Sequence, residues 1–365
     1  MNPIDRETFI HVFHTMTMSE PYRTRYRQLL TRHRSLFDGR IHEQREFLPW
    51  HRWYLLQVEN ILQQINCSVT LPYFDWSAHS HSPWTAPVWL ATQFGGNGNC
   101  NLGGGSRCCI QTGRFSSGQG WRKSNGECLK RQFDGTLPDM PAIMLVLSNS
   151  AAQFGRFETA VRGPLHDGPH CAFGGDMCTE YAAEDPMFNL HHAFIDAIWY
   201  RWQARSSAHL RAYFATRTTP LTGVPGATVR DYHNSHSLPG GIGVCYIDPA
   251  QGVITVSSVQ AARGLPASRV VAAASKVLAR LPAKTIAAIP RSKFTPLSAR
   301  GKALRLFHVT PADRARMTAY DRMLQPSRTV QQCGGTLPTA LDRHLGFPAD
   351  YVAADRKYTC KRRKP

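Results

Sequence analysis

Several features that mark other protein classes are missing from this chain of 365 residues. It has no run of 18 or more apolar residues, so we expect no transmembrane helix. The opening residues Met1–Asp5 lack the basic start and apolar centre of a secretory signal peptide. No signature of a nucleic-acid-binding fold is present, so nucleic acid is not expected as a partner. With 42% apolar and 19% charged residues, the composition is that of a folded, soluble protein.

Acidic residues are also scarce. Asp and Glu number 25 against 43 Lys and Arg, which gives a formal charge of +18, and the excess peaks at Lys361–Lys364. A basic surface can attract acidic matrix protein or anionic polysaccharide. The plainer interpretation, a solvated cationic surface without a dedicated partner, stays open.

Cysteine, by contrast, is plentiful. The chain has ten cysteines, and a crowded set lies in a Gly-rich segment that is poor in core-forming residues: Cys100, Cys108, Cys109 and Cys128. Disulfides would hold such a segment and imply an oxidising compartment, so we expect a secreted protein, although the pairings cannot be read from the sequence. The sequon Asn66–Ser68 is compatible with secretion. The missing signal peptide then means that it was removed, that the chain is a fragment, or that the compartment is a different one.

Helical periodicity dominates the first part of the chain, and we divide the chain into two regions. The predicted helices are residues 22–34, a helix that begins at Pro49, residues 140–162 up to a break at Gly163–Pro164, and residues 186 to about 206. A long Gly- and Cys-rich insertion covers about 86–135. We predict a helical domain over residues 1–235 and a basic accessory region of unknown role over residues 236–365. The latter contains a linker-like, a strand-like and an amphipathic piece at Leu238–Gly241, Gly252–Val259 and Val270–Leu281.

Three histidines in the first half are spaced for convergence on one ion. His33, His42 and His51 are nine residues apart each time. On one continuous helix, nine residues make two and a half turns, so successive rings would point to opposite sides. The sequence supplies turns at Asp38–Gly39 and just before Pro49, which would allow the three rings to meet.

A second histidine cluster follows the insertion. His166 and His170 are four apart, but Gly168–Pro169 between them argues against a regular helix, so we expect a tight loop there. His192 would come from the long helix that follows. His191 is rotated by about 100° from His192 on that helix, so we do not expect it to bind the same ion.

Six imidazoles in two trios suit a pair of metal ions. Such donors bind copper, zinc, iron or nickel, and the affinity order favours copper. Because neutral imidazole binds metal, we expect binding to weaken below about pH 6.5. We prefer His33 over His14 in the first trio. Other histidines remain rival ligands: His11, His79 and His81. Cys171 is expected in a disulfide with Cys178 or another cysteine, and not on the metal.

Several longer motifs carry a resemblance to a known family. They are Phe47–Leu55, Pro72–Trp76, His166–His170, Gly174–Met177 and Asp185–Asp196. Over about residues 20–205 the chain resembles the type-3 copper proteins, which comprise tyrosinases, catechol oxidases and molluscan haemocyanins, and it looks most similar to secreted animal tyrosinase-like proteins. The resemblance implies a mainly α fold, with an antiparallel four-helix bundle that holds a dinuclear copper site, long disulfide-stapled loops and a C-terminal extension.

The resemblance also implies an activity: a copper-dependent phenol oxidase that uses O2 to convert o-diphenols, and in some members monophenols, to o-quinones. Such quinones form melanin or crosslink protein, so small phenols or protein-bound tyrosine and DOPA are the expected substrates. Two classes stay open as alternatives. One is a reversible oxygen carrier of the haemocyanin type, and the other is a non-catalytic matrix protein that keeps the fold.

Specific roles carry over residue by residue. The ligands of the two coppers would be His33, His42 and His51 for one ion, and His166, His170 and His192 for the other. Phe188 matches the aromatic residue that packs between the metals, and Asp196 matches a carboxylate that orients a ligand ring. Glu158 matches a water-holding glutamate. Asp167 stands where many monophenol-active members have Asn, which puts hydroxylation of monophenols in doubt. No cysteine precedes His42 at the distance needed for the family's thioether crosslink, so we predict none.

Overall fold

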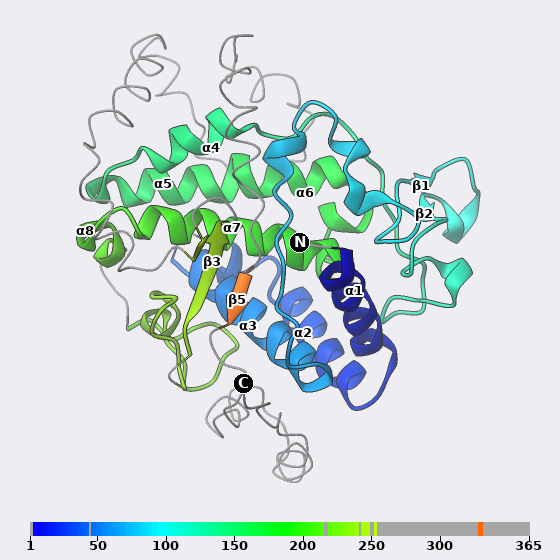
Figure 1. Ribbon diagram of the computed structural model, residues 1–365, viewed down its shortest axis with the longest axis horizontal. Coiled ribbons are helices and arrows are strands. Elements are labelled where there is room, and N and C mark those ends of the chain that lie inside the picture. The colour runs from blue at the N-terminus through cyan, green and yellow to red at the C-terminus, as the bar shows by residue number, and fades with distance from the viewer. Residues whose placement is uncertain are drawn as a thin grey trace.

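The protein is mainly helical. The structure, a computed structural model, describes residues 3–43, 45–214, 218–240, 242–248, 252–253 and 328–330. Its α-helices are α1 (Pro3–Met18), α2 (Tyr22–Ser35), α3 (Phe47–Ile65), α4 (Met140–Leu147), α5 (Phe154–Ala160), α6 (Gly168–Phe173), α7 (Met187–Gln203) and α8 (Ser207–Arg211). Two helices cross the centre of the molecule: α3, and α7 packed against it (Figure 1). The prediction of a mainly helical fold is confirmed. None of the described helices is long and apolar enough to cross a membrane.

Short helical turns and strands complete the list of elements. The 3-10 helices are η1 (Arg40–His42), η2 (Trp76–His79), η3 (Pro83–Thr85), η4 (Pro87–Trp89), η5 (Gly104–Ser106), η6 (Ser117–Gln119), η7 (Ala151–Gln153), η9 (Gly175–Cys178), η10 (Ala182–Glu184) and η11 (Val229–Tyr232), and η8 (Val161–Asp167) is a π-helix. The strands are β1 (Gly98–Asn99), β2 (Cys109–Ile110), β3 (Val244–Asp248), β4 (Gly252–Val253) and β5 (Arg328–Val330).

The helices that carry the histidines follow from their side-chain patterns. In α2, the side chains that recur at helical spacing are buried: Tyr26, Leu29, Leu30 and His33. In α3, nearly every residue from Phe47 to Leu62 is buried, because this helix is apolar on most of its circumference and is surrounded by other elements. The same holds for α7, so both of these histidine-bearing helices form the centre of the core.

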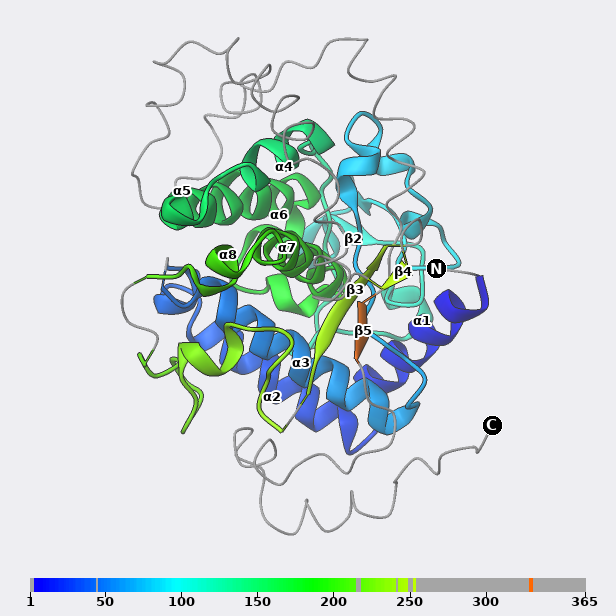
Figure 2. The ribbon, with the colours of Figure 1, turned by 60° about the vertical axis from the view of Figure 1, so that its left-hand side comes forward.

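The sequence prediction was wrong at Gly163–Pro164 and at Gly168–Pro169. Helix α5 continues into the π-helix η8, which passes through Pro164, and α6 follows directly, so the chain is helical across both positions (Figure 2). Pro164 has no N–H to donate in either helix type, and the helix accommodates it by widening to a π-turn, whose bonds join residues i and i+5. Pro169 lies in the first turn of α6, where its missing N–H costs nothing. The expected tight loop between His166 and His170 is therefore a helical turn.

The insertion is stapled by disulfides and packs firmly on the helices. Two bonds lie within it, Cys100–Cys108 and Cys109–Cys128, and β1 pairs with β2, the strand that contains Cys109. Its buried aromatic residues contact α1: the Phe115 ring lies 5.9 Å from that of Phe13, and Trp121 Nε1 donates to Thr17 Oγ1 at 3.0 Å. The prediction of disulfide-stapled loops is confirmed.

Two buried ion pairs connect distant parts of the chain. Arg131 of the insertion donates to both carboxylate oxygens of Asp185, just before α7, at 2.7 and 2.8 Å. Arg52 of α3 donates to Asp196 of α7 at 2.7 Å, and its guanidinium lies 3.8 Å from the centroid of the Trp199 ring. All four charged side chains are almost fully buried.

The chain continues to pack on the helices beyond residue 235. Leu238 and Ile242 are buried, and the Leu238 N–H donates to the Ile242 carbonyl at 2.9 Å, so the start of the linker-like piece packs on the core. In β3, Tyr246 Oη donates to Asp196 Oδ2 at 2.5 Å. Strand β3 lies between β4 and β5, with Val244 opposite Val330. The strand-like piece is described over Gly252–Val253, and the amphipathic stretch at 270–281 lies outside the described residues.

Candidate metal centre

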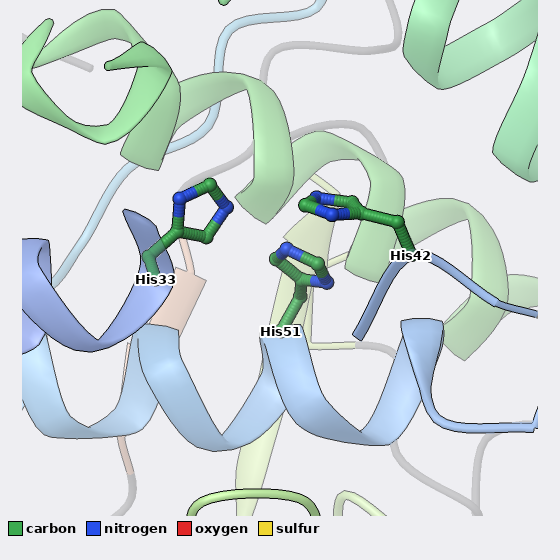
Figure 3. A group of neighbouring side chains, drawn as sticks. All are labelled: His33, His42 and His51. Atoms are coloured by element: carbon green, nitrogen blue, oxygen red, sulfur yellow. The ribbon is translucent and has the colours of Figure 1, made fainter. Parts of the chain in front are cut away.

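The first three histidines converge as predicted. His33 comes from α2, His42 from η1 and His51 from α3, and each offers a ring nitrogen within 4.8 Å of the others (Figure 3). The turn that allows this follows α2, where Gly39 N–H donates to the Leu36 carbonyl at 2.9 Å. The chain therefore turns at Asp38–Gly39, as the sequence indicated, and this turn brings His42 back toward His33.

Hydrogen bonds orient two of these rings and leave nitrogen atoms vacant for a metal. His42 Nδ1 lies 2.7 Å from the Phe37 carbonyl oxygen, and His51 Nδ1 lies 2.8 Å from that of Phe47. A carbonyl can only accept, so each Nδ1 carries the proton and each Nε2 keeps its lone pair. His51 Nε2 and both nitrogens of His33 are buried without a hydrogen-bond partner. Buried, unpaired imidazole nitrogens fit a bound metal ion.

The second cluster brings four imidazoles together. His166 of η8, His170 of α6 and His191 of α7 offer ring nitrogens within 4.8 Å of one another. His192 lies equally close, since its Nε2 is 3.2 Å from His166 Nε2 and 3.1 Å from His170 Nε2. The structure thus places all three predicted ligands side by side and adds His191, which the sequence analysis had placed elsewhere.

The two α7 histidines differ in what their ring nitrogens contact. His191 Nδ1 accepts a hydrogen bond from Trp76 Nε1 at 3.1 Å. Indole nitrogen only donates, so the neutral His191 ring carries its proton on Nε2. His192 Nε2 instead faces the two other rings, and its Nδ1 is buried without a partner. Trp76 belongs to a motif that the sequence analysis noted but did not link to the site.

Burial keeps these rings neutral. It lowers the pKa of His33, His51, His166 and His192 well below 6.5, and it lowers that of His170 to about 4. Desolvation disfavours the charged form, and the neighbouring imidazoles add to the effect. The rings are therefore ready to bind metal at neutral pH, and the expected loss of binding below about pH 6.5 shifts to lower pH.

Phe188 lies between the two groups of histidines. Its ring centroid is 4.9 Å from that of His33 and 4.1 Å from that of His192. The His51 and His192 rings stack directly at 4.2 Å. The two groups therefore form one continuous centre, with the Phe188 ring in contact with a histidine of each group.

Two buried or partly buried carboxyls have raised pKa values, and one of them contacts a histidine of the second group. Glu158 is fully buried, and burial raises its pKa to about 7 although Arg162 Nε donates to its Oε1 at 2.8 Å. Its other oxygen is buried without a partner. Asp167 contacts His166 Nδ1 at 2.8 Å, its side chain is 36% exposed, and burial raises its pKa to about 6. Arg162 was missed by the sequence analysis; its spacing of four from Glu158 is the signal that could have shown the pair.

Other predicted candidates lie apart from these groups. Among the described residues, the rival histidines belong to neither cluster: His11, His14, His79 and His81. The role expected for Asp196 was wrong, because its oxygens accept from Arg52 and Tyr246 and the structure shows no contact with a ligand ring. One cysteine expectation is confirmed, since Cys171 is bonded to Cys178.

Comparison with known proteins identifies the family to which this chain is similar. The family model described as the common central domain of tyrosinase matches residues 10–205. A tyrosinase of Streptomyces glaucescens is 32% identical over 207 residues, which cover 50% of this chain and 73% of that protein. A tyrosinase of Streptomyces lincolnensis is 33% identical over 213 residues, 53% of this chain and 75% of that protein. A tyrosinase-like protein of Diaporthe leptostromiformis is 36% identical over 192 residues, 45% of this chain and 50% of that protein.

These relatives are bacterial and fungal, whereas the motifs had suggested an animal protein. The family match nevertheless spans more than half of the chain and includes all of the histidines in the two groups. Two groups of three imidazoles are consistent with a dinuclear type-3 copper site. The chain belongs to the tyrosinase family and is a dicopper phenol oxidase of the tyrosinase type.

Proposed function

We propose that this protein oxidises o-diphenols to o-quinones, with small phenols or protein-bound DOPA as substrates. When bound, two copper ions supply the two-electron reduction of dioxygen. The observation that carries the proposal is the convergence of two imidazole groups around Phe188, with neutral rings and buried unpaired nitrogens on both sides. His33, His42 and His51 would hold one ion.

We assign His192, together with His166 and His170, to the second ion. The support is geometric, because His192 Nε2 points at both other rings while the proton on His191 Nε2 follows from the Trp76 contact. His191 then acts as a neighbour that packs against the ligands and does not donate to the metal. The variant H192A should lose one copper per chain, whereas H191F should keep both, as measured by metal analysis of the loaded protein.

Glu158 and Asp167 are proposed to handle the proton of a monophenol. A general base works best when its pKa is close to the working pH, and burial brings the two carboxyls to about 7 and about 6. Glu158 Oε2 is available to hold a water molecule, since no other group binds it. Asp167 keeps an acceptor oxygen beside the ligand His166, so aspartate can serve where Asn is found in other members.

Secretion and an acidic partner remain proposals. Disulfides in the insertion and beside His170 are typical of an oxidising compartment. The charge of +18 would bring the enzyme to acidic matrix protein or polysaccharide, where quinones crosslink neighbouring chains. A likeness to secreted animal proteins is part of this proposal and has the motifs of the sequence as its support.

The test is turnover of DOPA by the copper-loaded protein. We expect dopachrome formation that requires two coppers per chain and falls by at least about a hundredfold in H42A and H170A, each of which removes one site. H79A is the matched control, because His79 lies outside both groups. Full copper occupancy without turnover, in the intact chain and after proteolytic trimming of the C-terminal region, would overturn the proposal.

A further inference from the structure

A disulfide lies beside one imidazole of the second group. It joins the residue after this histidine to the residue after the one whose carbonyl orients the ring. Cys171 directly follows His170, and Cys178 directly follows Met177. His170 Nδ1 lies 2.7 Å from the Met177 carbonyl oxygen. The Cys171–Cys178 bond, with 4.5 Å between its Cα atoms, therefore fastens together the two ends of this hydrogen bond.

The hydrogen bond decides how His170 meets the metal. Because the Met177 carbonyl accepts from Nδ1, the lone pair of His170 lies on Nε2, which is 3.1 Å from His192 Nε2. Groups that orient a ligand histidine in this way typically change metal affinity by about 10- to 100-fold when they are altered. Anything that holds Met177 in place consequently acts on the second metal.

Other contacts also hold this turn, so it does not depend on the disulfide for its existence. Asp176 accepts from Lys123 Nζ and from the Lys130 N–H, both at 2.7 Å. Gly174 has a φ of 62°, and a Cβ there would lie 2.1 Å from the Gln132 carbonyl oxygen, so the insertion packs directly on the turn. Loss of the disulfide should therefore loosen the position of Met177 and leave the turn folded.

The position of this disulfide also makes it reachable. Cys171 and Cys178 are both partly exposed. Cys109 and Cys128 of the insertion are buried, with exposed fractions of 3% and 8%. A reductant in solution will reach the bond beside His170 more readily than the bond between these two.

We propose that the Cys171–Cys178 disulfide is a positioning element of the second metal site. Its loss weakens copper binding by His166, His170 and His192 and leaves the first group unaffected. In the described residues, no disulfide joins neighbours of His33, His42 or His51, so the effect is confined to one of the two ions. The inference rests on the proposed assignment of the second group as a copper site.

The test measures cuprous-ion affinity, by competition with bicinchoninate, in variants of the full chain that keep one site each. H42A retains the second group and H166A retains the first. Adding Cys171→Ser with Cys178→Ser should lower the affinity about 10- to 100-fold in H42A and by less than about threefold in H166A. An unchanged affinity in H42A, or an equal loss in both backgrounds, overturns the inference.

The matched control is Cys100→Ser with Cys108→Ser in the H42A background. This disulfide has nearly the same sequence separation, 8 against 7, and belongs to the insertion. Its removal should change the affinity by less than about threefold. A loss as large as that of the Cys171–Cys178 variant would show a general loosening of the protein and overturn the inference. H42A that binds no copper with all disulfides intact would instead overturn the site assignment, and this inference with it.

If the serine variant fails to fold, a second measurement on the native chain tests the same inference. The native chain is treated with tris(2-carboxyethyl)phosphine, which gives two electrons to the disulfide and becomes the phosphine oxide with an oxygen from water, while two protons go to the sulfurs. Iodoacetamide then caps both thiols and releases iodide. Treatment is extended until mass spectrometry finds Cys171 and Cys178 labelled. One copper should then be lost per chain, and two coppers retained on labelled protein would overturn the inference.

Discussion

Seven neutral imidazoles packed in one core set the acid sensitivity of this protein. They are the six proposed ligands, which are His33, His42, His51, His166, His170 and His192, together with His191. Burial lowers the pKa of each ring, because a charged imidazole would lose its hydration there. The same burial that prepares the lone pairs for copper thus makes the metal-free fold dependent on pH.

The first prediction concerns that metal-free fold. As pH falls below 6.5, the unfolded chain takes up protons on its histidines, whereas folded His170 does so only near its pKa of about 4. Stability must then fall across this interval, by about 3 kcal/mol for His170 alone. Four buried carboxyls act in the opposite direction, because burial raises the pKa of Glu158 to about 7 and of Asp167 to about 6 and also raises those of Asp75 and Asp176, but the seven histidines outnumber them. Urea denaturation from pH 7 to pH 4 measures the loss, and H170Q should show a shallower dependence.

The second prediction distinguishes the hydroxylation of monophenols from the oxidation of o-diphenols. Glu158→Gln removes a proton acceptor but keeps the shape of the side chain, so monophenol turnover should fall by about a hundredfold or more. Oxidation of o-diphenols should change by less than about threefold, because these substrates do not need the same proton step. Glu180→Gln is the control, since Glu180 is exposed. The ratio of the initial rates on tyrosine and DOPA is the readout, and an equal fall in both rates would contradict this role for Glu158.

At the scale of elements, the start of α7 is fixed by a buried ion pair. Asp185 accepts from Arg131 and also from the Met187 N–H at 2.9 Å, so it holds the first residue of the helix that carries Phe188 and His192. Removing one partner of a buried pair leaves an uncompensated charge, which is costly. The insertion is therefore part of the support of the metal centre.

The third prediction tests this support. Arg131→Met should destabilise the metal-free protein by about 3–5 kcal/mol. Adding Asp185→Asn should restore part of the loss, because the buried charge is then gone. Arg107→Met, at an exposed position of the same insertion, should change stability by less than about 0.5 kcal/mol. Urea denaturation gives these values, and a small effect of the Arg131 change would show that the pair does not support α7.

The helices and histidines show what a single sequence can predict. The spacing of His33, His42 and His51 with breakers between them was enough to predict their convergence, because both signals are local. The pairing of Arg131 with Asp185, 54 residues away, carries no local signal. The π-turn through Pro164 was missed because the rule that proline ends a helix applies to α geometry.

At the scale of the whole molecule, β3 ties the chain beyond residue 235 to the ligand helices. Asp196 accepts hydrogen bonds from both Tyr246 and Arg52, so this one carboxylate connects β3, α7 and α3. The division at residue 235 that the composition suggested stays a prediction about domains. What the contacts show is that Val244 and Tyr246 belong to the core of the helical unit.

The fourth prediction measures that connection. Tyr246→Phe removes the hydroxyl from a buried carboxylate and should cost about 1.5–3 kcal/mol. Tyr232→Phe is the matched control: Tyr232 is fully buried, but its hydroxyl has no hydrogen-bond partner, so its loss should be near neutral. Thermal unfolding of both variants gives the comparison. Equal effects would mean that the Tyr246 hydroxyl adds nothing beyond packing.

Arg52 has one more consequence. It follows the proposed ligand His51 on α3, and its partner Asp196 lies one turn after His192 on α7. This link fixes the separation of the two helices without any help from metal. We therefore expect the distance between α3 and α7 to stay the same when copper is loaded, because this buried ion pair already holds the two helices together in the metal-free protein.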